Sequence, residues 1–127
     1  MNVDGCVMKR KFGFEDLLVW KKAVEFSTNI IKMSEHLKTQ RKHYQLIEQL
    51  ESASTSVALN IAEGKGRFSK KEFIRFLYIA RGSLFETITL LIIFKELNWI
   101  NENTLENFKV QGDEIGKMIS GLINSIK

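Results

Sequence analysis

The chain has 127 residues, of which 44% are hydrophobic and 27% are charged, and its formal net charge is +4. This length suits one globular domain with its own core, and no Pro-rich or Ser-rich segment indicates a linker or a second domain. Proline is absent, so long uninterrupted helices are possible, and the single cysteine, Cys6, excludes an internal disulfide bond.

We expect the first 13 residues to form a flexible polar leader and residues 14–127 to form a helical domain. The leader has cations at positions 9–11 but no apolar run of the kind that forms the core of a signal peptide. We therefore expect a cytoplasmic protein, which the single cysteine also favours. The densest apolar stretch, residues 84–94, is much shorter than the roughly 20 residues that cross a bilayer, so no membrane partner is expected.

Apolar residues between Glu15 and Leu37 recur at alternating steps of four and three, which places them on one face of an α-helix. The stripe consists of Val19, Ala23, Phe26, Ile30, Met33 and Leu37. This spacing predicts a first helix over residues 15–37. The charged segment that follows, residues 38–43, is expected to form a turn.

A second helix is predicted from a shorter apolar stripe and is expected to end near Gly64. The stripe consists of Leu46, Leu50, Ala53 and Val57. Small residues dominate the middle of this helix, which indicates that another backbone approaches it closely. Asn60 continues the stripe, so we expect its side chain to point inward and to need hydrogen-bond partners.

A third helix is predicted to start at Ser69, which forms the capping-box pattern with Glu72 after the turn at residues 64–67. Its stripe runs for about seven turns, which would make it the longest element. The stripe consists of Phe73, Leu77, Ala80, Leu84, Thr87, Leu91 and Phe94.

A second apolar row on this third helix makes its later half apolar around most of its circumference. The row consists of Ile74, Tyr78, Phe85, Ile88 and Ile92. A small bundle buries one face of each helix, so the surplus predicts a homo-oligomer. The alternative is a tightly wrapped central helix in a monomer.

A fourth helix follows a short connection at residues 98–101, and three glycines are expected to make it less regular. Its stripe consists of Leu105, Phe108, Gly112, Ile115, Ile119, Leu122 and Ile126. Four helices with short connections favour an all-α fold, specifically an antiparallel up-down-up-down four-helix bundle.

Such a bundle would gather basic side chains at one end, where helix one starts, helix two ends and helix three starts. The candidates for contact with nucleic acid or another anion are Lys21, Lys22, Lys65, Arg67, Lys70, Lys71 and Arg75. Lys70 and Lys71 lie in the first turn of helix three, where the helix dipole disfavours cations, so a bound phosphate would explain their placement. The alternative is a solvated turn. Phe68 is the only aromatic residue of this turn, which supports base stacking weakly.

No pattern of catalytic or metal-binding residues is found, so we expect neither enzyme activity, nor a cofactor, a metal or a small-molecule substrate. His36 and His43 lack the spacing of a zinc site, and residues 64–67 do not complete a phosphate-binding Walker loop. Arg81 and Glu86 interrupt the apolar stretches of helix three. With Asn60, they predict a buried polar network that fixes helix register or subunit orientation, and ligand binding is the alternative.

Several motifs resemble the bacterial four helix bundle protein family, which includes proteins encoded in intervening sequences of 23S rRNA genes. They are the start Phe14-x-Asp16-Leu17-x-Val19-Trp20, the segment from Asn60 to Gly64, and the segments from Ser69 to Phe73 and from Ala80 to Glu86. The resemblance covers residues 12–127. It implies a four-helix protomer in a ring-like homopentamer without enzymatic activity.

Relatives that accompany diversity-generating retroelements bind a reverse transcriptase and are linked to nucleic acid through basic surfaces. The positions of this chain that match the family pattern are Asn60, Glu63, Gly64, Arg67, Glu72, Arg81, Gly82, Ser83 and Glu86. Of these, we expect Asn60, Glu63, Arg81, Ser83 and Glu86 to serve a polar network or assembly. One departure is Glu51-Ser52, where many relatives carry arginine, so RNA contact is expected at the turn and not along helix two.

The sequence therefore predicts a non-catalytic oligomeric binding module that contacts RNA, or a nucleoprotein partner, through its basic end. The alternative is a scaffold that binds only other proteins and whose positive charge is incidental.

Overall fold

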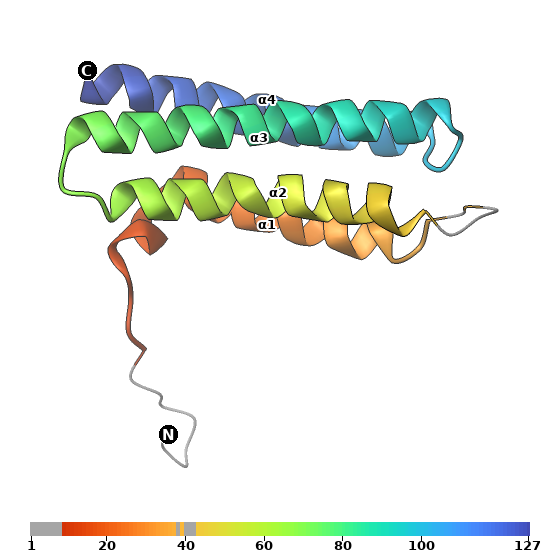
Figure 1. Cartoon of the computed structure of the whole chain (residues 1–127), viewed down its shortest axis with the longest axis horizontal. Coiled ribbons are helices and arrows are strands. Elements are labelled where there is room, and N and C mark those ends of the chain that lie inside the picture. The colour runs from red at the N-terminus through yellow and green to blue at the C-terminus, as the bar shows by residue number, and fades with distance from the viewer. Residues whose placement is uncertain (1–8, 38, 40–42) are drawn as a thin grey trace, which may run out of the picture.

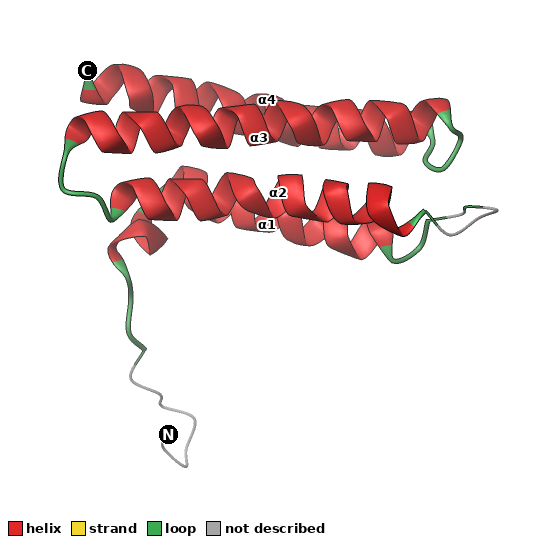
Figure 2. Ribbon diagram, viewed as in Figure 1, coloured by secondary structure: helices red, strands yellow, loops and turns green. Residues whose placement is uncertain are grey.

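The computed structural model describes residues 9–37, 39 and 43–127. Throughout these residues the regular structure is helical, without any strand, which confirms the prediction of an all-α fold with four α-helices (Figure 2). The elements are the short 3-10 helix η1 (Gly13–Asp16), α1 (Leu18–Ser34), α2 (Tyr44–Lys65), α3 (Lys70–Glu96) and α4 (Glu102–Ile126). Residues 1–8 of the predicted leader and most of the predicted turn at 38–43 lie outside the described residues.

The four α-helices lie side by side (Figure 1). The turn between α2 and α3 lies at one end of the molecule, and the turn between α3 and α4 lies at the other. The starts of α1 and α3 and the ends of α2 and α4 share one end. Between α3 and α4, Leu84 lies against Gly116. Arg81, which precedes Leu84 on α3, donates a hydrogen bond to Ser120, which follows Gly116 on α4. The contact between α2 and α3 is the most extensive, and that between α1 and α4 is the smallest.

Helix α1 is shorter than the helix predicted over residues 15–37. The Glu15 amide donates to the Phe12 carbonyl at 3.0 Å, which closes the 3-10 turn of η1, and the Phe12 amide donates to the Glu15 carboxylate at 2.8 Å. Leu17 then adopts an extended conformation with ψ 119°, so the α-helix begins only at Leu18. At its other end α1 stops at Ser34. The apolar stripe continues beyond the C-terminal end of α1 to Leu37, because a side chain outside a helix can also pack against the core.

The predicted start of α3 is found where the sequence placed it. Ser69 Oγ accepts a hydrogen bond from the backbone amide of Glu72 at 3.0 Å, which satisfies one free donor of the first turn. The second half of the expected capping box is absent, because the Glu72 carboxylate instead bonds to Arg75. Helix α3 has 27 residues and is the longest element in the described chain, as predicted.

The core is formed by the stripes that the sequence indicated. Fully or nearly fully buried side chains include Phe26, Ile30, Leu50, Val57, Ile61, Leu77, Leu84, Leu91, Phe94, Ile115, Ile119 and Ile123. The small residues of α2 allow close approach, and Ser54 is completely buried. Helix α4 continues without interruption through its three glycines, so the expected irregularity was wrong. Gly112 packs closely against α3, and a Cβ there would lie 2.9 Å from Ile88 Cδ1, so the end of that side chain would have to shift.

By length and composition alone, α3 is apolar enough to cross a bilayer, although 39% of its most apolar 18-residue window is buried inside the protein. The sequence estimate considered only residues 84–94, whereas the helix extends well beyond them on the N-terminal side. A helix in the core of a bundle can meet the same criterion, and α3 packs against both α2 and α4. The absence of a membrane partner stays a prediction.

Candidate nucleic-acid interface at the α2–α3 turn

The end of α2, the turn at residues 66–69 and the start of α3 carry most of the basic residues proposed to contact an anion. Lys65, Arg67, Lys70, Lys71 and Arg75 are all exposed. Glu63 and Glu72 are the carboxylates that lie among them, so this surface has a net charge of +3. The start of α1 lies at the same end of the molecule (Figure 1). The structure therefore brings together the segments that carry the predicted contact residues.

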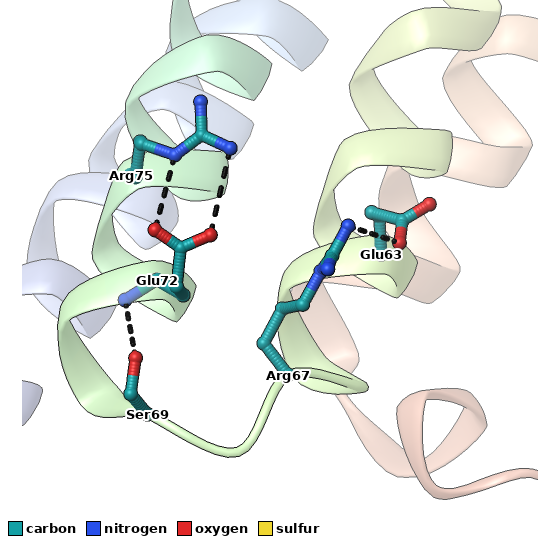
Figure 3. Close-up of polar contacts among 5 residues, drawn as sticks. All are labelled: Glu63, Arg67, Ser69, Glu72 and Arg75. Carbon is teal, nitrogen blue, oxygen red and sulfur yellow. Dashed lines mark hydrogen bonds and ion pairs between the residues drawn. The ribbon is translucent and has the colours of Figure 1, made fainter.

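The two arginines of this surface already have partners. Arg67 Nη2 lies 3.0 Å from Glu63 Oε2, and Arg75 Nε lies 3.3 Å from Glu72 Oε2 (Figure 3). Both guanidinium groups also lie over the ring of Phe76, with Cζ at 4.9 and 4.7 Å from its centroid. Exposed ion pairs of this kind contribute at most about 1 kcal/mol, so their main effect here is to hold the two arginines beside the helices.

Three lysines differ from the arginines in having no carboxylate partner among the described residues. Lys70 and Lys71 are exposed in the first turn of α3, where a cation is disfavoured by about 0.3–1 kcal/mol. Lys65 Nζ lies 5.9 Å from the ring centroid of Phe73, a cation–π contact that leaves its charge available to a ligand. Among the basic residues of the α2–α3 turn, these three ammonium groups can bind phosphate without first breaking an ion pair with a described residue.

The two lysines of α1 have different surroundings. Lys22 Nζ lies 2.8 Å from Glu114 Oε1, so this ion pair joins α1 to α4. The hydrogen bond to Glu114 and its negative charge raise the pKa of Lys22 above its ordinary value. Lys21 is exposed and forms no ion pair with the part of the chain that the structure describes. Of the two, Lys21 is the one whose charge is free.

A small polar network connects α2 and α3. Asn60 Nδ2 donates to the Ser56 carbonyl at 2.8 Å and lies 2.9 Å from Ser56 Oγ. Ser56 Oγ in turn lies 2.9 Å from Ser83 Oγ on α3. Asn60 is half-buried, at the edge of the core. The Ser56 hydroxyl connects it to Ser83, so two of the predicted network residues do belong to one network. Ser56 was not predicted, although its position four residues before Asn60 places it on the same helix face.

The other residues assigned to that network lie elsewhere. Arg81 Nη1 donates to Ser120 Oγ on α4 at 3.1 Å, and its guanidinium lies 5.0 Å from the ring centroid of Tyr78. Glu63 pairs with Arg67, as described above. Glu86 is exposed and has no hydrogen bond or ion pair to any described residue. Glu86 therefore does not lie in the interior of the protomer, because the outer face of α3 is not covered there, and its role in assembly stays a prediction.

That outer face carries large apolar side chains. Phe85 is 58% exposed and Tyr78 42%, and Ile79, Ile92 and Ile93 are exposed to a similar degree as Tyr78. Beside it, a groove of about 710 Å³ runs between α3 and α4 and is lined by Arg81, Phe85 and Gly116, among others. Of the predicted second row, Ile74 and Ile88 instead pack partly against the core. The surplus apolar surface is thus present on the protomer.

No cluster suited to a metal is found among residues 9–37, 39 and 43–127, since no three His, Cys, Asp or Glu side chains come together there. His43 stacks on Trp99, with 4.6 Å between ring centroids, and His36 is exposed. His43 therefore serves in packing, and His36 is a surface residue.

Fold and surface together define a small helical protein with a cationic end and an exposed apolar flank. The model of the 23S rRNA-intervening sequence protein family matches residues 15–121, so the chain belongs to this family. A comparison with curated proteins gives no match. Among solved structures, the chain is similar to a protein of unknown function from the S23 ribosomal protein family of Bacteroides thetaiotaomicron. The two are 26% identical with a TM-score of 0.78, over 84% of this chain and 98% of the other.

Proposed function

We propose that this chain is a non-catalytic, homo-oligomeric binding module that contacts RNA, or a nucleoprotein partner, through the α2–α3 turn. The protomer is proposed to be an antiparallel up-down-up-down bundle that assembles into a ring. The main support for RNA contact is a group of three exposed lysines that have no carboxylate partner among the described residues. They are Lys65, Lys70 and Lys71. Free ammonium groups favour phosphate binding, because binding releases condensed counterions from the nucleic acid.

The names of the matching family and of the similar structure support this proposal, because both refer to the ribosome. The matching model is named for intervening sequences of 23S rRNA, and the similar structure is assigned to a ribosomal protein family. The ion pairs of Arg67 and Arg75 narrow the proposed contact to the lysines, since a phosphate would have to compete with Glu63 and Glu72 for the guanidinium groups.

The test is an anisotropy titration of a structured RNA at several salt concentrations, with the wild type and with Lys70→Gln/Lys71→Gln. The wild type should lose affinity steeply as salt rises, and the double variant should bind more weakly. The slope of log K against log salt should fall by about 1 for each phosphate contact that is lost.

The matched control is Lys32→Gln/Lys109→Gln, which removes the same charge from the last turn of α1 and from α4. It should leave the salt slope within about 0.3 of the wild-type value, because neither lysine belongs to the turn. Absence of RNA binding by the wild type at low salt, or an equal loss in both double variants, would contradict the proposal.

A second candidate function is a scaffold that binds only proteins. It is favoured by the exposed apolar face of α3, on which Phe85 is 58% exposed. Under this alternative the lysines keep the protein soluble, and the salt titration gives no binding at any concentration.

A further inference from the structure

Phe68 lies in the turn between α2 and α3 and is the most exposed of the large hydrophobic residues in the described part of the chain. Its exposed fraction is 109%, whereas the next most exposed large apolar residue, Phe12, is at 66%. An aromatic ring in this position is not covered by its own protomer, although burying it would be favourable. The sequence located this ring in the turn but could not show that nothing covers it.

The surroundings of Phe68 are cationic. Lys65, Lys70 and Lys71 lie within three residues of it, are exposed and have no carboxylate partner in the described residues. The immediate neighbours Arg67 and Ser69 are polar. An apolar protein groove that received the ring would also have to desolvate these charges, which is costly. The ligand that fits both features is an anion with a flat apolar face.

The backbone on both sides of Phe68 is held by hydrogen bonds. The Gly66 amide donates to the Ala62 carbonyl at 3.2 Å, and the Arg67 amide donates to the Gly64 carbonyl at 3.1 Å. On the other side, Ser69 caps α3 through its bond to the Glu72 amide. A ring held on a fixed turn loses little conformational entropy when a ligand stacks on it.

We propose that Phe68 stacks on an unpaired base while Lys65, Lys70 and Lys71 contact the adjacent phosphates. This inference rests on the proposed function and specifies its substrate class: single-stranded or looped RNA in preference to continuous duplex. A duplex keeps its base faces stacked inside the helix, so it offers the ring no partner, whereas an unpaired base presents a face to an aromatic side chain. An anionic membrane fits less well, because the turn offers a single apolar side chain for insertion.

The experiment compares two RNAs of equal length and charge, a hairpin with an unpaired loop and a blunt duplex, by anisotropy at several salt concentrations, beginning at low salt. The wild type should bind the hairpin more tightly than the duplex. Phe68→Ala should weaken hairpin binding by about 5- to 100-fold and leave duplex binding unchanged. Its salt slope should equal that of the wild type, because no phosphate contact is removed. Phe68→Tyr, which keeps a ring, should retain hairpin affinity.

Tyr44→Ala is the matched control, since it removes an exposed ring from the opposite end of α2 and should not change RNA affinity. If the wild type binds neither RNA, the proposed function itself fails. If it binds both with a steep salt dependence and Phe68→Ala has no effect, or weakens both equally, only the stacking inference is overturned.

Two further measurements test whether Phe68 instead binds a membrane or a second copy of the chain. Binding to vesicles of equal parts phosphatidylserine and phosphatidylcholine that is lost in Phe68→Ala would overturn the inference in favour of a membrane. A change in subunit number for Phe68→Ala by native mass spectrometry would overturn it in favour of a second copy of the chain. Unchanged subunit number, absence of vesicle binding and selective loss of hairpin affinity together support it.

Discussion

Gly64 shows how a single residue sets the distance between α2 and α3. A Cβ at this position would lie 2.7 Å from Phe76 Cβ and 3.3 Å from the carbonyl oxygen of Phe73. Both of those atoms are fixed to the backbone of α3 and cannot move without shifting the helix. The close approach of the two helices therefore depends on the absence of a side chain.

Gly64→Ala should destabilise the protein by about 1–3 kcal/mol, because the added methyl group overpacks the α2–α3 contact. The matched control is Gly82→Ala in the middle of α3, where a Cβ would meet nothing within 4 Å. That substitution should stabilise by about 0.5–1 kcal/mol, since alanine favours a helix more than glycine does. Urea unfolding of both variants measures the difference, and the same sign for the two would contradict the packing argument.

At the residue scale the sequence predicts buried positions better than partners. The Ser69 cap and the buried stripe residues could be identified, because capping and helical periodicity are local properties. The environment of Glu86 could not, because its exposure depends on which neighbours cover α3. Likewise, the sequence showed Arg67 and Arg75 as cations but could not show that Glu63 and Glu72 already pair with them.

At the scale of elements, α2 and α3 form the closest pair, and their shared polar contact adds to the packing. Ser56 and Ser83 are joined by one hydrogen bond of 2.9 Å, and Asn60 extends it along α2. A half-buried hydrogen bond between two helices fixes their register, because sliding either helix would leave its polar groups without partners.

A double-mutant cycle of Ser56→Ala and Ser83→Ala should give a coupling of about 0.5–1.5 kcal/mol in the free energy of unfolding. The coupling is expected because either single substitution removes the same hydrogen bond. The matched control combines Ser56→Ala with Ser125→Ala, since the Ser125 hydroxyl donates to the Leu122 carbonyl within α4. This pair should be additive within about 0.5 kcal/mol. Additivity in both cycles would mean that the Ser56–Ser83 bond contributes nothing to stability.

The existence and order of the four helices could be predicted, whereas the start of the first could not. The apolar pattern suggested a helix from Glu15, but the hydrogen bond from the Glu15 amide to the Phe12 carbonyl closes a 3-10 turn first. The choice between the two conformations depends on this contact and on the packing of Phe14 against Trp20, whose ring centroids lie 5.1 Å apart. The periodicity of apolar residues predicts neither the hydrogen bond nor this ring contact.

For the whole molecule, the exposed apolar face of α3 is the feature that a single protomer leaves unexplained. Tyr78, Ile79, Phe85, Ile92 and Ile93 share it. Contiguous apolar surface of this kind is typical of a subunit interface. Homo-oligomerisation therefore remains our prediction, as it was from the sequence.

Phe85→Glu should weaken self-association at least tenfold, because a carboxylate would be desolvated in place of an apolar ring. Native mass spectrometry and light scattering over a range of concentrations would measure the change. Val110→Glu is the control, since Val110 is 65% exposed on α4 and does not belong to the α3 face. A wild-type protein that is monomeric at micromolar concentration would contradict the prediction.

The dominance of contacts between helices that are consecutive in the chain also bears on how the protein folds. The α2–α3 pair has the most extensive contact and is connected by residues 66–69 alone, so little loop entropy is lost when the pair forms. Helix α1 can then pack against α2, and α4 against α3. The smaller contact between α1 and α4 would form last. Because few of the stabilising contacts span the whole chain, the protomer should fold within about a millisecond and leave its core side chains exposed only briefly.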